Sequence, residues 1–369
     1  MITTQKFFSL LKKKKINFFT GVPDSCLKHF TNLIFSGKNN VIAANEGSAV
    51  ATGIGYHLKT KKIPLVYLQN SGIGNAMDPL TSLATKESYS IPMVLLVGWR
   101  GSPTGKKDEP QHRMMGRITK KLLKLMDIKT QVIKSDKDLP KISKLINYTK
   151  KNNKPVALLI DRGVFSKTNH HHIHNYSQIN LPLRSEAIED ILKNVKKNSK
   201  IISTVGFTSR ELYQIRKVKK YKNGRDFLMI GGMGHTAATS LGISLFDKND
   251  VYCLDGDGSF LMHMGGVASA VAYTNKNLKY ILFDNNSHES VGPTNQPTIS
   301  NKINFKKIAE GLNFDQVFEI TNIKDLLKLK KYLKSKGSIF ILIKIKSQSL
   351  SNLTRPKSTY DIKRVFMKG

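Results

Sequence analysis

Short apolar runs alternate along this chain with longer amphipathic segments. The clearest runs are 65–68, 156–160, 251–254 and 278–283. Runs of this length that are almost entirely apolar are typical of strands buried on both faces, and amphipathic segments of roughly 10 to 15 residues between them are typical of helices. The pattern predicts an α/β fold made of doubly wound parallel sheets with helices on both faces.

The pattern occurs twice along the chain. The matched pairs are 16–21 with 201–206 (185 positions apart), 65–72 with 251–258 and 93–97 with 279–283 (186), and Gly55 with Gly242 (187). Four matches at nearly one offset predict two related domains. Each is expected to run strand, helix, strand, glycine-rich helix, strand, helix, strand.

We expect the first domain at residues 1–165 and the second at 184–369, with no third domain between them. Residues 166–183 are polar, lack a helical or strand period and are predicted to form a linker. This linker holds His170, His171, His172 and His174. A metal site is the alternative, but no cysteine or carboxylate cluster completes a coordination shell, so a solvated linker is favoured.

The chain is strongly basic, with 60 Lys and Arg against 26 Asp and Glu in 369 residues and a net charge of +34. The lysines are scattered, and no nucleic-acid-binding motif accompanies them, so specific nucleic-acid binding is not expected. A basic nucleic-acid-associated protein on a degenerate enzyme scaffold is the rival interpretation. No apolar stretch is long enough to cross a membrane and no signal peptide is evident. Two distant cysteines, Cys26 and Cys253, favour the reducing cytoplasm.

Polar residues with ligand chemistry follow two of the predicted strands. Gly256-Asp257-Gly258-Ser259 comes after run 251–254, and Asn285, 28 positions beyond Asp257, comes after run 278–283. Carboxylate, amide and main-chain oxygens suit Mg²⁺, which completes its shell with substrate phosphates. The pattern predicts a site for a metal-bound diphosphate, with Asn286 as the alternative to Asn285 if the turn is shifted by one residue.

Two further segments have competing interpretations. Glu46 begins a helix of small residues, where it serves either as a helix N-terminal charge or as a functional acid. Gly232-Met233-Gly234-His235 imitates a dinucleotide fingerprint. A nicotinamide site would leave the repeat and Glu46 unexplained, so we expect Gly234 and His235 to help hold the diphosphate.

The order strand, Gly-Asp-Gly, helix, strand, Asn resembles the fingerprint of thiamine diphosphate enzymes. Other motifs narrow the resemblance to the phosphonopyruvate decarboxylase family and, less closely, to sulfopyruvate decarboxylases. They are Gly21–Ser25, Asn45–Gly47, Asn70–Gly72, Trp99–Gly101, Lys107–His112 and Asp284–Asn285. The resemblance covers nearly the whole chain. It departs at 292–296, where Gly-Pro-Thr-Asn-Gln replaces the family's usual Gly-Gly-Gln.

The resemblance implies a thiamine diphosphate- and Mg²⁺-dependent lyase that converts 3-phosphonopyruvate to phosphonoacetaldehyde and CO₂ in phosphonate biosynthesis. Sulfopyruvate is the alternative substrate. The implied catalytic residues are Glu46, which activates the cofactor, and His112 and Asp24, which handle protons. The implied cofactor contacts are Glu46, Asn70, Gly234, His235, Gly256, Asp257, Gly258, Ser259 and Asn285; the metal ligands are Asp257, Asn285 and the Ser287 carbonyl; the substrate contacts are Ser25, Arg100 and Gln111.

Simpler roles remain open for three of these residues. Asp24 is placed to cap the helix that runs through Phe35, His112 is an ordinary loop residue in the simpler interpretation, and Arg100 a solvated one. The family's sites form where its two kinds of domain meet. The resemblance therefore also implies a homodimer or higher homo-oligomer with shared active sites, in which Glu46 of one chain faces Asp257 of another.

Overall fold

The computed structural model describes residues 1–35, 37–105, 107–168, 180–292, 296–356 and 358–368. The chain divides into two compact units, unit 1 with Met1–His174 and Thr294–Pro297, and unit 2 with Asn175–Pro293 and Thr298–Gly369. The histidines of segment 170–174 lie outside the described residues. The linker at 166–183 therefore stays a prediction.

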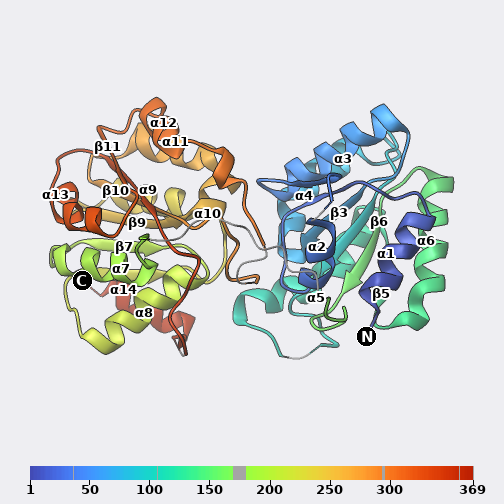
Figure 1. Ribbon diagram of the computed structural model, residues 1–369, viewed down its shortest axis with the longest axis horizontal. Coiled ribbons are helices and arrows are strands. Elements are labelled where there is room, and N and C mark those ends of the chain that lie inside the picture. Colours follow the sequence, from blue (N-terminus) through green and yellow to red (C-terminus); the bar gives the residue numbers. More distant parts are fainter. Residues whose placement is uncertain (36, 106, 169–179, 293–295, 357, 369) are drawn as a thin grey trace. The chain divides into compact units, whose positions relative to one another are not determined.

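Unit 1 contains, within its described residues, a six-stranded parallel sheet with the order β2-β1-β3-β4-β6-β5. The strands are β1 (Phe19–Gly21), β2 (Asn40–Ile42), β3 (Leu65–Gln69), β4 (Val94–Gly98), β5 (Lys129–Ile133) and β6 (Val156–Ile160). One face carries α1 (Thr4–Lys13), α2 (Lys28–Phe35) and α6 (Leu139–Asn152), and the other carries α3 (Glu46–Thr60), α4 (Ile73–Asp78) and α5 (Pro110–Leu125) (Figure 1). Shorter turns are η1 (Asn70–Gly72), η2 (Pro79–Leu83) and η3 (Asp136–Asp138).

Unit 2 contains a second six-stranded parallel sheet over its described residues, with the order β11-β12-β10-β9-β7-β8. The strands are β7 (Lys200–Ser203), β8 (Arg225–Leu228), β9 (Val251–Gly256), β10 (Leu278–Asp284), β11 (Gln316–Ile320) and β12 (Ile339–Lys344). One face carries α7 (Arg184–Asn194), α8 (Phe207–Lys219) and α13 (Leu329–Leu333), and the other carries α9 (Thr236–Ser244), α10 (Asp257–Met262), α11 (Met264–Tyr273) and α12 (Phe305–Gly311). Shorter elements are η4 (Ser300–Lys302), η5 (Lys324–Lys328) and the C-terminal α14 (Thr359–Met367).

The two sheets share one strand order, because adding six to each strand number of unit 1 gives the order of unit 2. The helices on corresponding faces also correspond in sequence order. These findings confirm the predicted α/β class and the predicted relation between the two halves. The predicted element order was incomplete, since it gave four strands per half where each described sheet has six.

The offset of 186 between β3 and β9 was wrong by one residue. Leu65 faces α1, α2 and α6, and the first residue of β9 on the corresponding face is Tyr252, 187 positions later (252 − 65). At this offset Asn70 corresponds to Asp257 (257 − 70). A strand buried on both faces has no alternation of apolar and polar residues, so its sequence does not distinguish offsets that differ by one.

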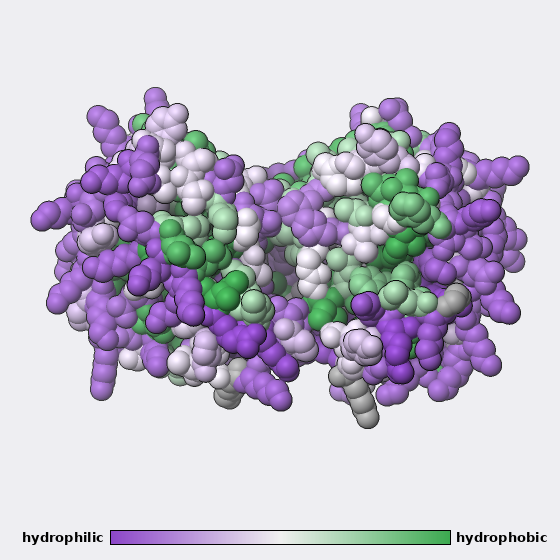
Figure 2. Space-filling view, turned by 180° about the vertical axis from the view of Figure 1, so that it is seen from behind, coloured by the Kyte–Doolittle hydropathy of each residue, from purple (hydrophilic) through white to green (hydrophobic). Residues whose placement is uncertain are grey.

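Hydrophilic side chains cover most of the surface seen in Figure 2, as the lysine content requires. Apolar patches interrupt this surface on each unit. In unit 2 the most exposed large apolar side chains include Phe246 (91% exposed) and Tyr273 (70%). None of the described helices combines the length and apolar character needed to span a bilayer.

Candidate active site

In unit 2, Asp257 and Asn285 follow neighbouring strands at the same edge of the sheet. β9 and β10 are parallel partners, with Phe283 opposite Gly256. Both strands end here, β9 leading directly into α10 at Asp257 and β10 into the turn at Asn285. This adjacency is what the spacing of the two apolar runs predicted.

Asp257 is a buried carboxylate in an electronegative setting. Its side chain is 3% exposed and accepts a hydrogen bond from the Thr298 hydroxyl. Burial and the neighbouring Asp284 carboxylate raise the pKa of Asp257 to about 7. Asp284 in turn is ion-paired with Lys344 of β12. Two carboxylates balanced by one lysine leave this edge of the sheet with surplus negative charge, which favours a cation.

The two asparagines after β10 have different surroundings. Asn286 adopts a left-handed backbone (φ 55°), and its side-chain oxygen accepts hydrogen bonds from Ser300 Oγ at 3.1 Å and Asn301 N at 3.4 Å. Asn285 Oδ1 accepts one from Ser287 N at 3.1 Å. The Asn286 oxygen is thus hydrogen-bonded to two residues of the η4 turn. Of the two asparagines, Asn285 is therefore the better candidate for a metal ligand.

The residues around the start of α10 have two kinds of role. Gly256 leaves its backbone accessible, whereas Ser259 holds neighbouring segments together. A Cβ at Gly256 would meet nothing within 4 Å, so its backbone is accessible. Ser259 is buried, accepts a hydrogen bond from Gly234 N at 3.0 Å and lies 3.1 Å from the Thr204 hydroxyl. It therefore ties the start of α10 to the glycine loop before α9. His235 stacks on His263 with ring centroids 4.5 Å apart.

Other polar residues at this edge were not singled out from the sequence. A Cβ at Gly258 would lie 2.7 Å from the His288 ring, so the glycine lets the imidazole pack on it. Burial lowers the pKa of His288 to about 4, which keeps the ring neutral near pH 7. Asp255 accepts a 2.6 Å hydrogen bond from the buried Tyr280 hydroxyl and thereby ties the end of β9 to β10. His288 and Asp255 both lie within three residues of a predicted ligand. This closeness in sequence is the feature from which they could have been singled out.

In unit 1, Glu46 begins α3 with its side chain buried. Asn45 caps the helix by accepting a hydrogen bond from Ser48 N at 2.8 Å. Glu46 is 5% exposed and accepts a 2.8 Å hydrogen bond from Asn75 Nδ2, and burial raises its pKa. A Cβ at Gly72 would lie 2.2 Å from Glu46 Oε1, so only glycine fits there. Burial therefore favours the protonated form of this acid more than in an exposed glutamate.

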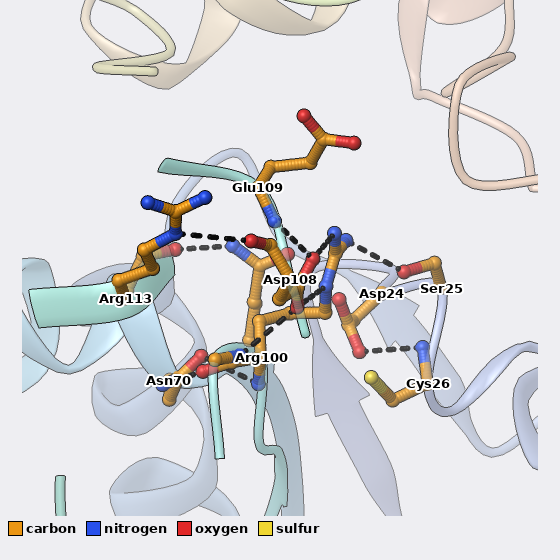
Figure 3. Close-up of polar contacts among 11 residues, drawn as sticks. Asp24, Ser25, Cys26, Asn70, Arg100, Asp108, Glu109 and Arg113 are labelled. Atoms are coloured by element: carbon orange, nitrogen blue, oxygen red, sulfur yellow. Dashed lines mark hydrogen bonds and ion pairs between the residues drawn. The ribbon is translucent and has the colours of Figure 1, made fainter. Parts of the chain in front are cut away.

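A second cluster in unit 1 surrounds the guanidinium of Arg100 (Figure 3). Arg100 donates two 2.7 Å hydrogen bonds to the Asp108 carboxylate and a third, from Nη1, to Ser25 Oγ at 3.1 Å. Burial opposes ionisation of Asp108, but Arg100 and the Gly101 amide hold its pKa at about 2. The alternative of a solvated Arg100 is wrong, because its side chain is 15% exposed and ion-paired. Because Nε and Nη2 are hydrogen-bonded to Asp108, Nη1 is the guanidinium nitrogen that contacts Ser25.

Asp24 lies beside this cluster, after β1. It does not cap α2, because its Oδ1 accepts from Cys26 N at 2.8 Å while α2 begins at Lys28. Its Oδ2 is buried without a hydrogen-bond partner, and burial raises the pKa of the carboxyl. A Cβ at Gly98 would lie 1.9 Å from Asp24 Oδ1. An unpaired buried oxygen is costly and points to a group that would complete it.

Asn70, His112 and Gln111 complete the predicted residues of unit 1. The Asn70 side chain accepts from Arg100 N (3.1 Å) and donates to Arg100 O and Thr119 Oγ1 (2.9 Å each), so its amide fixes the backbone of Arg100. The alternative of His112 as an ordinary loop residue is wrong, because it lies in the first turn of α5. Burial and the charge of Arg100 lower its pKa to about 4. Gln111 is half-buried beside it.

The donor sets in the two units suit thiamine diphosphate and a hard cation. The open backbone at Gly256 leaves room for a phosphate. The groups that lower the pKa of Asp257 are neutral donors, so a cation would stabilise its carboxylate. Among the described residues no three His, Cys, Asp or Glu gather into a metal centre.

Family comparisons agree with this chemistry. The family described as "Thiamine pyrophosphate enzyme, N-terminal TPP binding domain" matches residues 1–120, and its C-terminal TPP binding domain matches residues 204–343. The chain is 32% identical to the phosphonopyruvate decarboxylase of Streptomyces viridochromogenes over 92% of its own length and 87% of that protein. It is 35% identical to sulfopyruvate decarboxylase subunit beta of Methanothermobacter thermautotrophicus (44% of this chain, 82% of that one) and to subunit alpha of Methanocaldococcus jannaschii (42% and 90%).

The fold and the two matching domains define a thiamine diphosphate-dependent decarboxylase, thiamine pyrophosphate being the same cofactor. Within that class the chain belongs to the phosphonopyruvate decarboxylase family.

Proposed function

We propose that this protein decarboxylates 3-phosphonopyruvate to phosphonoacetaldehyde and CO₂ in phosphonate biosynthesis. The observation that carries the proposal is the similarity to a phosphonopyruvate decarboxylase along 92% of the chain. A cytoplasmic location is part of the proposal, supported by the two free, buried cysteines. Loss of CO₂ breaks a carbon–carbon bond and leaves an electron pair on the former keto carbon. Thiamine diphosphate, when bound, supplies the electron-accepting ring for that pair.

Residues of both units would hold the cofactor. Asp257, Asn285 and the Ser287 carbonyl would hold Mg²⁺ and, through it, the diphosphate, with Gly256 and Gly234 as the backbone that phosphate oxygens approach. The support is the buried carboxylate of Asp257 and the free backbone face of Gly256. Glu46 would donate its proton to the aminopyrimidine ring of the cofactor, for which its burial and raised pKa are the support.

The cluster around Arg100 would handle the substrate. Arg100 Nη1 and the Ser25 hydroxyl form a donor pair at 3.1 Å that suits an anionic oxygen. Asp24, with a raised pKa and an unpaired Oδ2, would hold the proton delivered to the keto carbon. His112, with its pKa near 4, would act as a neutral hydrogen-bonding group beside it, and Gln111 as a further donor.

The substrate assignment is tested by CO₂ release from phosphonopyruvate, sulfopyruvate and pyruvate under one set of conditions. Buried donors left unpaired by pyruvate should lower its kcat/KM by several orders of magnitude. Pyruvate turnover as fast as that of phosphonopyruvate would refute the assignment. Faster turnover of sulfopyruvate would support the second candidate, which the matches to sulfopyruvate decarboxylase subunits favour.

The metal site is tested by titration. Asp257→Ala and Asn285→Ala each remove one oxygen ligand and should raise the Mg²⁺ concentration needed for cofactor binding, measured by calorimetry. Asn286→Ala is the matched control, because the Asn286 oxygen is engaged by Ser300. Unchanged affinity in the first two variants would remove the proposed ligands.

We propose a homodimer or a multiple of it, with Glu46 of one chain and Asp257 of another acting on the same cofactor. Two observations support assembly. The similar sulfopyruvate decarboxylases have separate alpha and beta subunits. Unit 2 also exposes large apolar side chains such as Phe246. Mixing Glu46→Gln with Asp257→Ala chains should restore activity, because some hybrid dimers contain one intact site. Failure after verified subunit exchange would contradict shared sites.

A further inference from the structure

A buried ion network lies within unit 2 at the start of α7. Arg184, the first residue of that helix, is 4% exposed. Its guanidinium is ion-paired with Glu289, in the turn after β10, and lies 3.5 Å from Glu211 Oε2 on α8. Both carboxylates are buried as well. One arginine therefore stabilises two buried carboxylates that approach it from different elements.

Only one of these carboxylates also contacts the turn that holds Asn285. Glu289 Oε2 accepts a 3.0 Å hydrogen bond from Asn285 Nδ2 and is also the atom paired with Arg184. Glu211 instead accepts from Leu350 N at 2.9 Å. The two glutamates are thus matched in burial and in their arginine partner, but differ in their contact with Asn285.

The contact with Glu289 determines which way the Asn285 amide is turned. An asparagine side chain has a donor end and an acceptor end. With the NH₂ group on the Glu289 carboxylate, the carbonyl oxygen Oδ1 lies on the opposite side, where Ser287 N also donates to it at 3.1 Å. The reverse orientation would bring two acceptor oxygens together. Since a hard cation binds the oxygen and not the NH₂ group, orientation decides whether Asn285 is a ligand.

We propose that Glu289, held by Arg184, is a positioning residue for the metal site, fixing the Asn285 amide with its oxygen toward the cation. The inference rests on the proposed function, in which Asn285 is a Mg²⁺ ligand. Groups that orient metal ligands typically change metal affinity 10- to 100-fold when they are removed. The contacts from Arg184 to Glu289 and from Glu289 to Asn285 thereby link the start of α7 to the proposed metal site through side chains alone.

The test measures Mn²⁺ binding in the presence of thiamine diphosphate, from the paramagnetic resonance signal of free Mn²⁺. Glu289→Ala should raise the Mn²⁺ dissociation constant about tenfold or more. Glu289→Gln should retain most of the affinity, because its one amide oxygen can take the place of Oε2 and accept from both Arg184 and Asn285. Glu211→Ala is the matched control: it removes the other carboxylate on Arg184 and should leave the dissociation constant unchanged. At saturating Mg²⁺ the kcat of Glu289→Ala should recover, whereas its KM for the metal stays high.

A second pair of variants keeps the test decisive if Glu289→Ala does not fold. Glu289→Met keeps the side-chain volume without an acceptor oxygen, and should raise the Mn²⁺ dissociation constant as Glu289→Ala does. Asn285→Asp offers two equivalent oxygens, so in that background the same Glu289→Met substitution should not weaken metal binding further. Equal weakening by Glu211→Ala and Glu289→Ala would overturn the inference as a general loss of structure. Weakening by Asn285→Ala but not by Glu289→Ala would overturn it and leave the proposed function intact. A wild-type protein that binds no Mn²⁺ would overturn both.

Discussion

Replacing Glu46 by Gln should make the protein nearly inactive and, at neutral pH, more stable. Glutamine has the same shape and keeps an oxygen for the 2.8 Å hydrogen bond from Asn75, so the fold of α3 should be preserved. It has no acidic proton to donate to the cofactor. A positioned acid or base contributes roughly 10²- to 10⁴-fold to a rate, or about 3 to 5 kcal/mol of barrier.

The stability change follows from the raised pKa of the buried carboxyl. The folded protein holds this proton more tightly than the unfolded chain, whose glutamate pKa is about 4.3. Wild-type stability therefore falls as pH rises from that value through the raised pKa, and the Gln variant lacks this loss. The melting temperature of the variant should exceed that of the wild type at pH 7.5, and the difference should vanish near pH 4.

The assays are CO₂ release at saturating cofactor and metal, and thermal unfolding of the cofactor-free protein at both pH values. Glu186→Gln is the control, because Glu186 also lies in a first helical turn, where it accepts from Leu183 N at 2.7 Å. That variant should keep its activity and lose a little stability. Activity of Glu46→Gln within about tenfold of the wild type would refute the catalytic role. A variant less stable at pH 7.5 would refute the account of its burial.

Three further outcomes follow from contacts described above. Asp108→Ala removes the carboxylate that accepts two hydrogen bonds from Arg100, and should lower the free energy of unfolding by about 3 kcal/mol. An unchanged midpoint of denaturant unfolding would contradict this. Tyr280→Phe removes the hydroxyl that donates to Asp255 and should cost about 1.5 to 3 kcal/mol, whereas a neutral effect would mean that Asp255 finds another donor. His112, with its pKa lowered to about 4, should show NMR ring shifts that stay flat from pH 8 to about 5. Because the unfolded chain binds this proton near pH 6.5 and the folded protein only near pH 4, stability should decrease as pH falls from about 6.5 to about 4. An NMR inflection near pH 6.5 would refute the burial of the ring.

The sequence was sufficient for the fold class and for the adjacency of Asp257 and Asn285 at the ends of β9 and β10. Both strands are mostly apolar, and parallel strands end at a common edge, so Asp257 and Asn285 were expected to lie close together. The sequence did not settle the register of the repeat, because Leu65 and its neighbours are apolar toward both faces.

The ion pairs around the predicted residues were beyond sequence reasoning. Arg100 is ion-paired with Asp108 outside any helix or strand, and no periodic pattern marks a contact of that kind. Arg184 and Glu289 are 105 positions apart and contact each other through tertiary packing alone. The sequence thus indicated which residues are candidates for the chemistry, but not which partners hold them in place.

The correspondence between Asn70 and Asp257 has a consequence for the history of the chain. Both residues follow the third strand of their sheet in sequence order, yet Asn70 binds the backbone of Arg100, whereas Asp257 is a buried carboxylate suited to a cation. Two sheets of identical strand order are what duplication of a single-domain ancestor leaves behind. After such a duplication the two copies were free to diverge at this position, with a carboxylate in unit 2 and, in unit 1, an amide that binds the neighbouring backbone. Equivalent strand ends in the two units thus carry polar side chains that do different work, one fixing a loop and the other offering a buried negative charge.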